Sequence, residues 1–162
     1  KISEIFKKKP ISFYGKTKLL AENYIIKKLH KSKKNYCIGR IFSTSNINQK
    51  KNYLVPDLIQ KIRKEKKIIV LKNLNHYRDF ISMKEISEII MKLYKINFNG
   101  IINIGRGRGI LLKDIALLLC KKFKKKCKFV DNKKITYLIA NNKKLRKYTK
   151  IKTTTSLEKL IF

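Results

Sequence analysis

The chain has 162 residues, and its 42 Lys and Arg against 10 Asp and Glu give a formal net charge of +32 at pH 7. This length allows one hydrophobic core with a smaller lobe, and no apolar run approaches the length of a membrane-spanning helix. The sequence shows no zinc-finger spacing, no aromatic RNA-binding signature and no clear helix-turn-helix, so the charge predicts non-specific adhesion to polyanions and no specific nucleic-acid partner.

The first 35 residues predict a basic lead-in followed by an amphipathic helix. Residues 1–9 resemble neither a signal peptide nor a domain start, so we expect the sequence to begin partway through a larger fold. A helix follows Gly15 and fades into the polar segment 30–35. Its apolar residues at helical spacing are Leu19, Leu20, Tyr24, Ile25 and Leu29.

The middle of the chain continues the alternation of strand and helix. The run 36–42 is typical of a buried parallel strand, and residues 43–52 predict a polar loop before a helix over 54–64. A strand over 67–71 and a loop over 73–77 come next. Ser82 and Glu85 form an S-x-x-E capping box, which predicts a helix from 83 to about 94. Its inward residues should be Ile86, Ile89, Ile90 and Leu93.

The last third predicts a strand over 100–105, a helix over 112–123 and a strand over 127–130. Gly105, Gly107 and Gly109 lie between the first strand and the helix, and Asp131 ends the next strand, which superficially resembles a dinucleotide-binding unit. Ile110 stands where the third glycine should be, so we predict a structural turn. The tail 141–162 predicts short helical pieces, and four of its residues should dock on the body: Leu157, Leu160, Ile161 and Phe162.

The cysteines and histidines predict no metal site. Cys37, Cys120 and Cys127 lack any Cys-x-x-Cys pairing, and an odd count fits a reducing, cytoplasmic location. Cys37 lies in an apolar run and is predicted to belong to the core. His30 and His76 are isolated from each other and from cysteine or carboxylate clusters.

Tyr14 and Lys18 are four residues apart, which places them one turn apart on one face of a helix. A positive charge beside a phenol favours the phenolate, so such a pair suits proton transfer. The spacing alone is weak evidence, because Tyr24 with Lys28 and Tyr148 with Lys152 share it in this lysine-rich chain. The context is stronger: a proline, a serine and a glycine break the chain around Tyr14 just before the helix.

Five motifs in order then define a resemblance that spans almost the whole chain. They are P-x-S-x-Y-G-x-T-K-x-x-x-E at 10–22, GRIFS at 39–43, NYLVP at 52–56, RDFIS at 78–82 and NIGRGRG at 103–109. Together they resemble the extended short-chain dehydrogenase/reductases, specifically the NAD-dependent nucleotide-sugar epimerases and dehydratases. The resemblance covers only the latter half of such an enzyme.

The resemblance implies a fold class and a division of the chain. It implies an α/β fold, with the C-terminal part of a Rossmann-type parallel sheet and a small α/β substrate-binding lobe. Residues 1–50 would complete the NAD-binding domain. Residues 51–162 would form mainly the sugar-nucleotide lobe, with some segments returning to the Rossmann domain.

The resemblance also implies roles for individual residues. Tyr14 would be the acid/base, and Lys18 would assist it and hold the nicotinamide ribose. Ile41 and Phe42 would touch the nicotinamide end of NAD or NADP. The substrate diphosphate would meet four residues, of which Tyr53 and Leu54 act through backbone N–H groups and Arg78 through its guanidinium. The fourth is Ser43, which stands where the family often has Asn.

Several features depart from the family pattern or leave alternatives open. The glycine-rich cofactor loop and the triad Ser or Thr lie upstream in the family, so we expect these residues alone to bind NAD poorly. Near Asp131 a Pro-Arg-Arg stretch is replaced, leaving Lys133 and Lys134 as weak substitutes. A homodimer through the helix after Gly15 is compatible with the resemblance. The alternatives are a sugar-nucleotide reductase and a non-catalytic basic module that binds polyanions.

Overall fold

The computed structural model describes residues 1–162 except 47–48, 51, 66–67, 152, 154 and 162. Its helices are α1 (Phe13–Lys31), α2 (Leu54–Lys64), α3 (Met83–Lys95), α4 (Leu112–Lys122), α5 (Lys143–Thr149) and α6 (Leu157–Ile161). Its strands are β1 (Cys37–Ile41), β2 (Ser43–Thr44), β3 (Ile69–Lys72), β4 (Tyr77–Arg78), β5 (Phe80–Ile81), β6 (Gly100–Ile104), β7 (Ile110–Leu111), β8 (Cys127–Val130) and β9 (Tyr137–Leu138).

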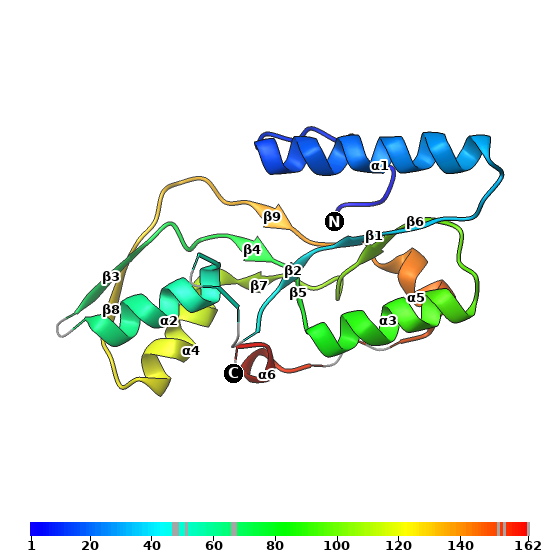
Figure 1. Cartoon of the computed structure of the whole chain (residues 1–162). Coiled ribbons are helices and arrows are strands. Elements are labelled where there is room, and N and C mark those ends of the chain that lie inside the picture. The colour runs from blue at the N-terminus through cyan, green and yellow to red at the C-terminus, as the bar shows by residue number, and fades with distance from the viewer. Residues whose placement is uncertain (47–48, 51, 66–67, 152, 154, 162) are drawn as a thin grey trace.

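Parallel pairing dominates the strands, as the alternation of strand and helix predicts. Strand β1 pairs in parallel with β6 from Cys37↔Gly100 to Ile41↔Ile104. Strands β2–β5, β3–β8 and β4–β9 are also parallel, and β4–β7 is antiparallel. Helix α1 lies on one side of β1 and β6, and α3 and α5 lie on the other (Figure 1). The prediction of an α/β fold is therefore confirmed.

Two hydrophobic clusters hold these elements together. The first joins α2, α4, β3 and α6, and it includes the fully buried Ile62, Ala116 and Leu119. The second joins α3, β6 and α5 around Ile89 and Ile102. Leu160 and Ile161 are buried in the first cluster and Leu157 packs against it, so the predicted docking of the tail is confirmed for these residues. Phe162 lies outside the described residues.

Helix α1 contacts the rest of the chain through a stripe that the spacing of its apolar residues alone does not identify. The half-buried stripe consists of Gly15, Leu19, Glu22, Ile26 and Leu29. By contrast Leu20, Tyr24 and Ile25, which also recur at helical spacing, are exposed. A carboxylate occupies the middle of the contact face, where hydrophobic periodicity expects an apolar residue.

The lead-in is more ordered than the sequence predicts. Ile2 bridges in parallel to Ala140, and its backbone oxygen accepts a hydrogen bond from Asn141 N at 2.8 Å. Glu4 accepts a hydrogen bond from Asn103 N at 2.9 Å. Residues 2–4 therefore attach to the end of β6 and to the segment after β9, instead of forming a loose arm.

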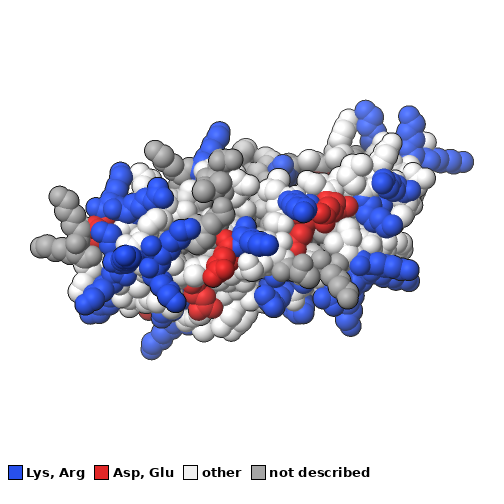
Figure 2. All heavy atoms as spheres, turned by 90° about the horizontal axis from the view of Figure 1, so that it is seen from below, with Lys and Arg blue, Asp and Glu red and all other residues white. Residues whose placement is uncertain are grey.

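The surface carries the charge that the composition implies. Figure 2 shows Lys and Arg side chains over both ends of the displayed face, with few acidic side chains between them. None of the helices in the described part of the chain is long and apolar enough to cross a membrane. Adhesion of polyanions to this surface stays a prediction.

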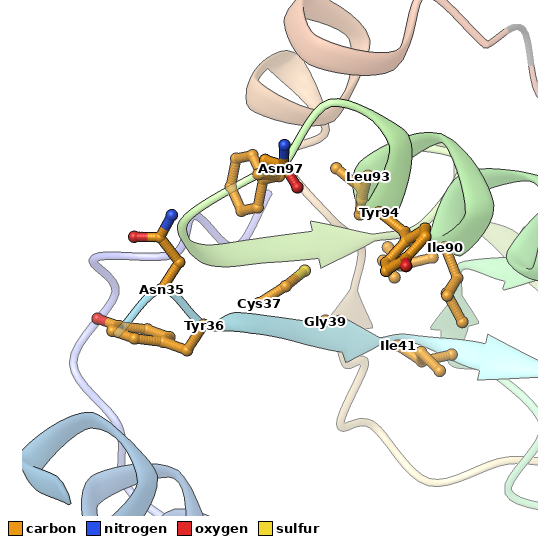
Figure 3. A pocket seen from close by; sticks show the side chains of 11 residues that line it. Asn35, Tyr36, Cys37, Gly39, Ile41, Ile90, Leu93, Tyr94 and Asn97 are labelled. Atoms are coloured by element: carbon orange, nitrogen blue, oxygen red, sulfur yellow. The ribbon is translucent and has the colours of Figure 1, made fainter. Parts of the chain in front are cut away.

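A cavity of about 410 Å³ lies beside β1 (Figure 3). Two residues that were predicted to be buried border it. Cys37 and Ile90 both line it, from β1 and α3. Cys37 is exposed and Ile90 is 48% exposed, so neither belongs to the core. Strand β1 is parallel as predicted, but alternate residues of the strand face solvent. The cavity brings no acidic side chain to its wall, and its lining is mainly apolar and aromatic.

Candidate active site

One cavity of about 590 Å³ is lined by seven of the eight residues that the sequence implicates. These seven are Tyr14, Ile41, Phe42, Ser43, Tyr53, Leu54 and Arg78. They come from the start of α1, the β1–β2 connection, the start of α2 and strand β4. Thr44 and Gln49 also line it, and the Gln49 amide donates to Thr44 O at 3.3 Å. Neither of these two residues carries a sequence signal beyond its place in the loop after β1.

The eighth residue, Lys18, lines an adjacent cavity of about 670 Å³. Ile41, Phe42 and Ser43 line both cavities, so the β1–β2 connection forms the wall between them. The second cavity is bounded by residues 2–10, by α1 and by β1, and it has a basic rim. Tyr14 and Lys18 therefore line two adjacent cavities that are separated by the β1–β2 connection.

Tyr14 lies in the first turn of α1, which begins after the N-cap Ser12. The Ser12 hydroxyl accepts a hydrogen bond from Gly15 N at 3.1 Å, which satisfies one of the free amides of the helix start. Lys18 Nζ lies 5.3 Å from the centre of the Tyr14 ring. Lys28 Nζ lies 5.8 Å from the Tyr24 ring, so ring contact does not distinguish the two pairs. The distinction is that Tyr14 borders the cavity that also contains Arg78.

Two polar features of the cavity wall suit an anion. The Arg78 guanidinium donates from Nη1 to Tyr77 O and to Thr136 Oγ1, both at 2.9 Å, and burial lowers the pKa of this side chain. Helix α2 begins after Tyr53, whose side chain makes no capping hydrogen bond and whose own N–H donates to Lys50 O at 3.1 Å. The positive end of the helix is therefore carried by the amides that follow Tyr53, beginning with Leu54. The described residues contain no ion pair to Arg78.

Asp79, the residue after Arg78, is fully buried and holds the glycine turn closed. Its carboxylate accepts hydrogen bonds from Arg106 N and Gly107 N at 2.8 Å and from Ala140 N at 3.1 Å. Burial raises the pKa of Asp79, while these three N–H groups act in the opposite direction. Gly107 has φ +73°, and a Cβ there would lie 2.5 Å from Asn142 Oδ1.

The amides of this turn are therefore already bound to an internal carboxylate. A phosphate would need the same N–H groups, so the turn does not fit the diphosphate of a dinucleotide. This geometry agrees with the structural turn predicted from the spacing of its glycines. Among the described residues, no group of three His, Cys, Asp or Glu side chains could hold a metal ion.

Hydrogen bonds between charged side chains hold helix α1 against strand β1. No sequence motif predicted this network. Glu22 receives hydrogen bonds from Arg40 Nε at 2.9 Å, from Arg40 Nη2 at 2.7 Å and from Lys8 Nζ at 2.7 Å. Arg40 Nη1 also donates to Glu4 O at 2.8 Å. The hydrogen bond from Arg40 is the largest reason that the pKa of Glu22 falls from 4.5 to about 2.

The α/β fold, with a Tyr and a Lys beside the ends of parallel strands, points to a class of enzyme, and similarity to known proteins shows which class it is. Residues 2–105 match the model of the NAD dependent epimerase/dehydratase family. The chain belongs to this family, which confirms the resemblance drawn from its motifs. The family model covers α1, the β1–β2 connection, α2 and Arg78, and it ends at the glycine turn.

The chain is also similar to one curated protein and to several solved structures. It is 33% identical over 121 residues to GDP-6-deoxy-D-talose 4-dehydrogenase of Aggregatibacter actinomycetemcomitans, covering 74% of this chain and 40% of that protein. UDP-glucuronic acid 4-epimerase from Bacillus cereus, in complex with NAD, has a TM-score of 0.85 at 24% identity. RMD from Pseudomonas aeruginosa, complexed with NADPH, has a TM-score of 0.85 at 16% identity.

These matches cover nearly all of this chain and only part of each relative. The two structures match 99% of this chain, which spans 53% of the epimerase and 56% of RMD. The chain therefore shares the α/β fold of part of each enzyme and spans about half their length.

The family binds NAD or NADP, and the residues present fit one end of that cofactor. Tyr14, Lys18 and the Ile41–Phe42 wall offer a phenol, an ammonium group and an apolar surface on adjoining cavities, which suits a ribose and a nicotinamide ring. The glycine turn does not suit the diphosphate of the cofactor, because the Arg106 and Gly107 N–H groups already donate hydrogen bonds to Asp79.

Proposed function

We propose that residues 1–162 form the C-terminal half of an NAD-dependent nucleotide-sugar epimerase or dehydratase. The half would carry the Tyr and Lys of the active site and most of the sugar-nucleotide lobe. The observation that carries this proposal is the shared cavity, which brings Tyr14, the β1–β2 connection and Arg78 together from distant parts of the chain. Residues 1–50 would complete the cofactor domain, and residues 51–162 would form mainly the substrate lobe.

The proposed chemistry is hydride transfer at a sugar carbon. NAD or NADP, when bound, supplies reversible hydride acceptance at that carbon. Tyr14 would accept the proton of the neighbouring sugar hydroxyl and return it in the reverse step. Lys18, whose ammonium group lies near the Tyr14 ring, would stabilise the negative charge that develops on the phenol oxygen.

The opposite end of the cavity would hold the substrate diphosphate. Arg78 offers a guanidinium, which binds phosphate oxygens in pairs. At the start of α2 the Leu54 N–H would offer a backbone donor at the positive end of the helix dipole, whereas the Tyr53 N–H would first have to leave Lys50 O, to which it donates at 3.1 Å. Ser43, in the shared wall, would bind between the sugar and the diphosphate. Ile41 and Phe42 would contact the nicotinamide and exclude water from the reacting carbon.

A dehydrogenase or reductase of sugar nucleotides is the second candidate. It is favoured by the match to a GDP-6-deoxy-D-talose 4-dehydrogenase. Both candidates need the same Tyr, Lys and diphosphate site, so they differ in the fate of the oxidised sugar. The third candidate, a non-catalytic basic module, would bind polyanions through its net charge of +32 and would not need Arg78 in particular.

Binding of nucleotide sugars to the chain separates these candidates. We expect UDP-glucuronic acid, dTDP-glucose or GDP-6-deoxy-D-talose to bind with 1:1 stoichiometry in calorimetry. Arg78→Ala should weaken the binding about tenfold to a hundredfold, because a charge-assisted bidentate contact contributes roughly 1.5–3 kcal/mol. Tyr14→Phe should bind almost as well as the unchanged chain, because its role is in proton transfer.

Arg63→Ala is the matched control, since this arginine lies over the Phe123 ring and takes no part in the cavity. It removes the same charge and should leave nucleotide-sugar affinity unchanged. If Arg63→Ala weakened binding as much as Arg78→Ala, the attraction would come from overall charge and the basic-module candidate would replace the enzyme. Absence of binding by all three nucleotide sugars would also reject the proposal.

A further inference from the structure

We propose that Arg40 and Glu22 are positioning residues, whose ion pair sets the distance between helix α1 and the β1–β2 connection and so the place of Tyr14 in the cavity. This inference rests on the function proposed above. It concerns two residues to which neither the motifs nor the comparisons assign a role.

Helix α1 depends on this pair because it has little else to hold it. The helix has 19 residues and none of them is buried. Its contact stripe contains the half-buried Leu19, Ile26 and Leu29, and Glu22 occupies the centre of that stripe. Apolar contacts are non-directional, whereas a two-point bond between a guanidinium and a carboxylate fixes both distance and orientation. The Glu22–Arg40 pair is therefore the contact that can define where α1 lies.

The two ends of the pair are tied to the two sides of the candidate site. Glu22 follows Lys18 by one helical turn and Tyr14 by two, on the same helix. Arg40 immediately precedes Ile41 and Phe42, which form the wall shared by the two cavities. A change in the Glu22–Arg40 distance would consequently move the phenol and the wall apart.

The Glu22–Arg40 pair is also shielded from solvent, and each of its two side chains makes a further hydrogen bond. The side chains of Glu22 and Arg40 are 10% and 22% exposed, so solvent screening is weaker than for a surface pair. Lys8 adds a second cation to the Glu22 carboxylate, and Arg40 Nη1 binds the backbone of Glu4. The charged groups around Glu22 are thus Lys8 and Arg40, with Glu4 behind Arg40 and Lys18 one turn earlier.

Fluorine NMR of the Tyr14 ring tests the inference without requiring activity. The chain is prepared with 3-fluorotyrosine, and Tyr14→Phe identifies the Tyr14 signal. Because Tyr14 is already 70% exposed, the readout is the chemical shift that its neighbours in the cavity impose, and we expect Glu22→Gln and Arg40→Gln each to move this signal away from its position in the unchanged chain. The double variant should move it no further than the larger single change, because the two residues act as one unit.

Matched variants separate positioning from general stabilisation. Glu88→Gln, at an exposed carboxylate of α3, should leave the Tyr14 signal in place. Arg40→Lys keeps the charge but loses the two-point contact, so it should give an intermediate signal even if Glu22→Gln folds poorly. Variants that lower the melting temperature while the Tyr14 signal stays at its original position would overturn the inference.

The two experiments distinguish a failure of this inference from a failure of the proposed function. If nucleotide sugars fail to bind but the Tyr14 signal follows the ion pair, the proposed function fails and the geometric role of the pair stands. If nucleotide sugars bind through Arg78 and the Tyr14 signal ignores the pair, the reverse holds.

Discussion

Asp79 shows how much of this fold depends on one buried carboxylate. It joins β4 to the turn after β6 and to the segment after β9 through three backbone N–H groups. Asp79→Ala would leave Arg106 N, Gly107 N and Ala140 N without an acceptor inside the protein. Since each unsatisfied buried donor costs roughly 1–3 kcal/mol, we expect the free energy of unfolding to fall by about 3 kcal/mol or more in a urea titration.

The exposed carboxylate of Asp114 on α4 provides the control for this change. Asp114→Asn should alter the free energy of unfolding by less than about 1 kcal/mol, because it removes only a weak interaction with the helix dipole. Equal effects of the two substitutions would mean that Asp79 acts through charge alone and not through its three hydrogen bonds.

A second prediction concerns Glu22 and the way the free energy of unfolding depends on pH. Hydrogen bonds from Arg40 and then Lys8 outweigh burial and lower the pKa of Glu22 from 4.5 to about 2. The folded state therefore favours the carboxylate, and this contribution is fully present above pH 4.5 and lost as the pH falls toward 2. A shift of this size corresponds to about 3 kcal/mol.

Unfolding of the chain and of Glu22→Gln should be compared across this pH range. The unchanged chain should be the more stable by about 3 kcal/mol near neutral pH, and the difference should shrink from about pH 4.5 to about pH 2. Asp79 has the opposite sign, because burial raises its pKa, but it is common to both proteins and cancels. A difference that stayed constant across this pH range would show that Glu22 acts through packing and not through its charge.

At the scale of elements, the start of α3 also secures the tail of the chain. Ser82 Oγ accepts from Glu85 N at 3.2 Å, and the Glu85 carboxylate accepts from Ser82 N at 3.0 Å and from Thr155 N at 3.1 Å. Ser82→Ala should cost about 1 kcal/mol as a lost helix cap. It should also make the segment around Thr155 more sensitive to limited proteolysis.

Ser87→Ala is the comparison for this helix, since the Ser87 hydroxyl bonds within α3 to Met83 O at 3.0 Å and caps nothing. Its effect on the melting temperature and on proteolysis should be close to zero. Faster cleavage near Thr155 in Ser87→Ala as well would mean that the tail responds to α3 in general and not to its cap.

The elements also show where sequence patterns succeed and fail. Helix α2 and strand β8 have the predicted bounds, since amphipathic periodicity and a short apolar run are local signals. Strands β2, β7 and β9 were missed because two residues are too few to carry a pattern. The contact face of α1 does not follow from its apolar spacing because its central contact is Glu22, whose partner Arg40 lies 18 residues away.

The candidate site follows the same division. The residues brought together at the cavity came from motifs in the sequence, and their roles stay predictions. Arg40 and Asp79 received no role because their hydrogen bonds join distant segments, and Gln49 received none because nothing in its polar loop distinguishes it. The spacing of Gly105, Gly107 and Gly109 predicted a structural turn, and the structure adds that Asp79 accepts hydrogen bonds from the Arg106 and Gly107 amides of this turn.

At the scale of the whole molecule, the part of the fold that these 162 residues form predicts weak affinity for NAD. The chain covers 53–56% of the two solved relatives described above, and its glycine turn is filled by Asp79. The contacts proposed for this part of the chain, at Tyr14, Lys18 and Phe42, would suit the nicotinamide end. We expect calorimetry on these residues to give a dissociation constant for NAD well above micromolar.

Two further measurements make this expectation specific to the missing diphosphate contacts. Nicotinamide mononucleotide, which lacks the adenylate half, should bind about as weakly as NAD, because Asp79 already occupies the amides of the glycine turn that a second phosphate would need. Raising the salt concentration should weaken both ligands, since lysine-rich surfaces attract any phosphate. Micromolar NAD binding that persists in high salt would contradict the prediction, and it would require a diphosphate site within this chain other than the closed glycine turn.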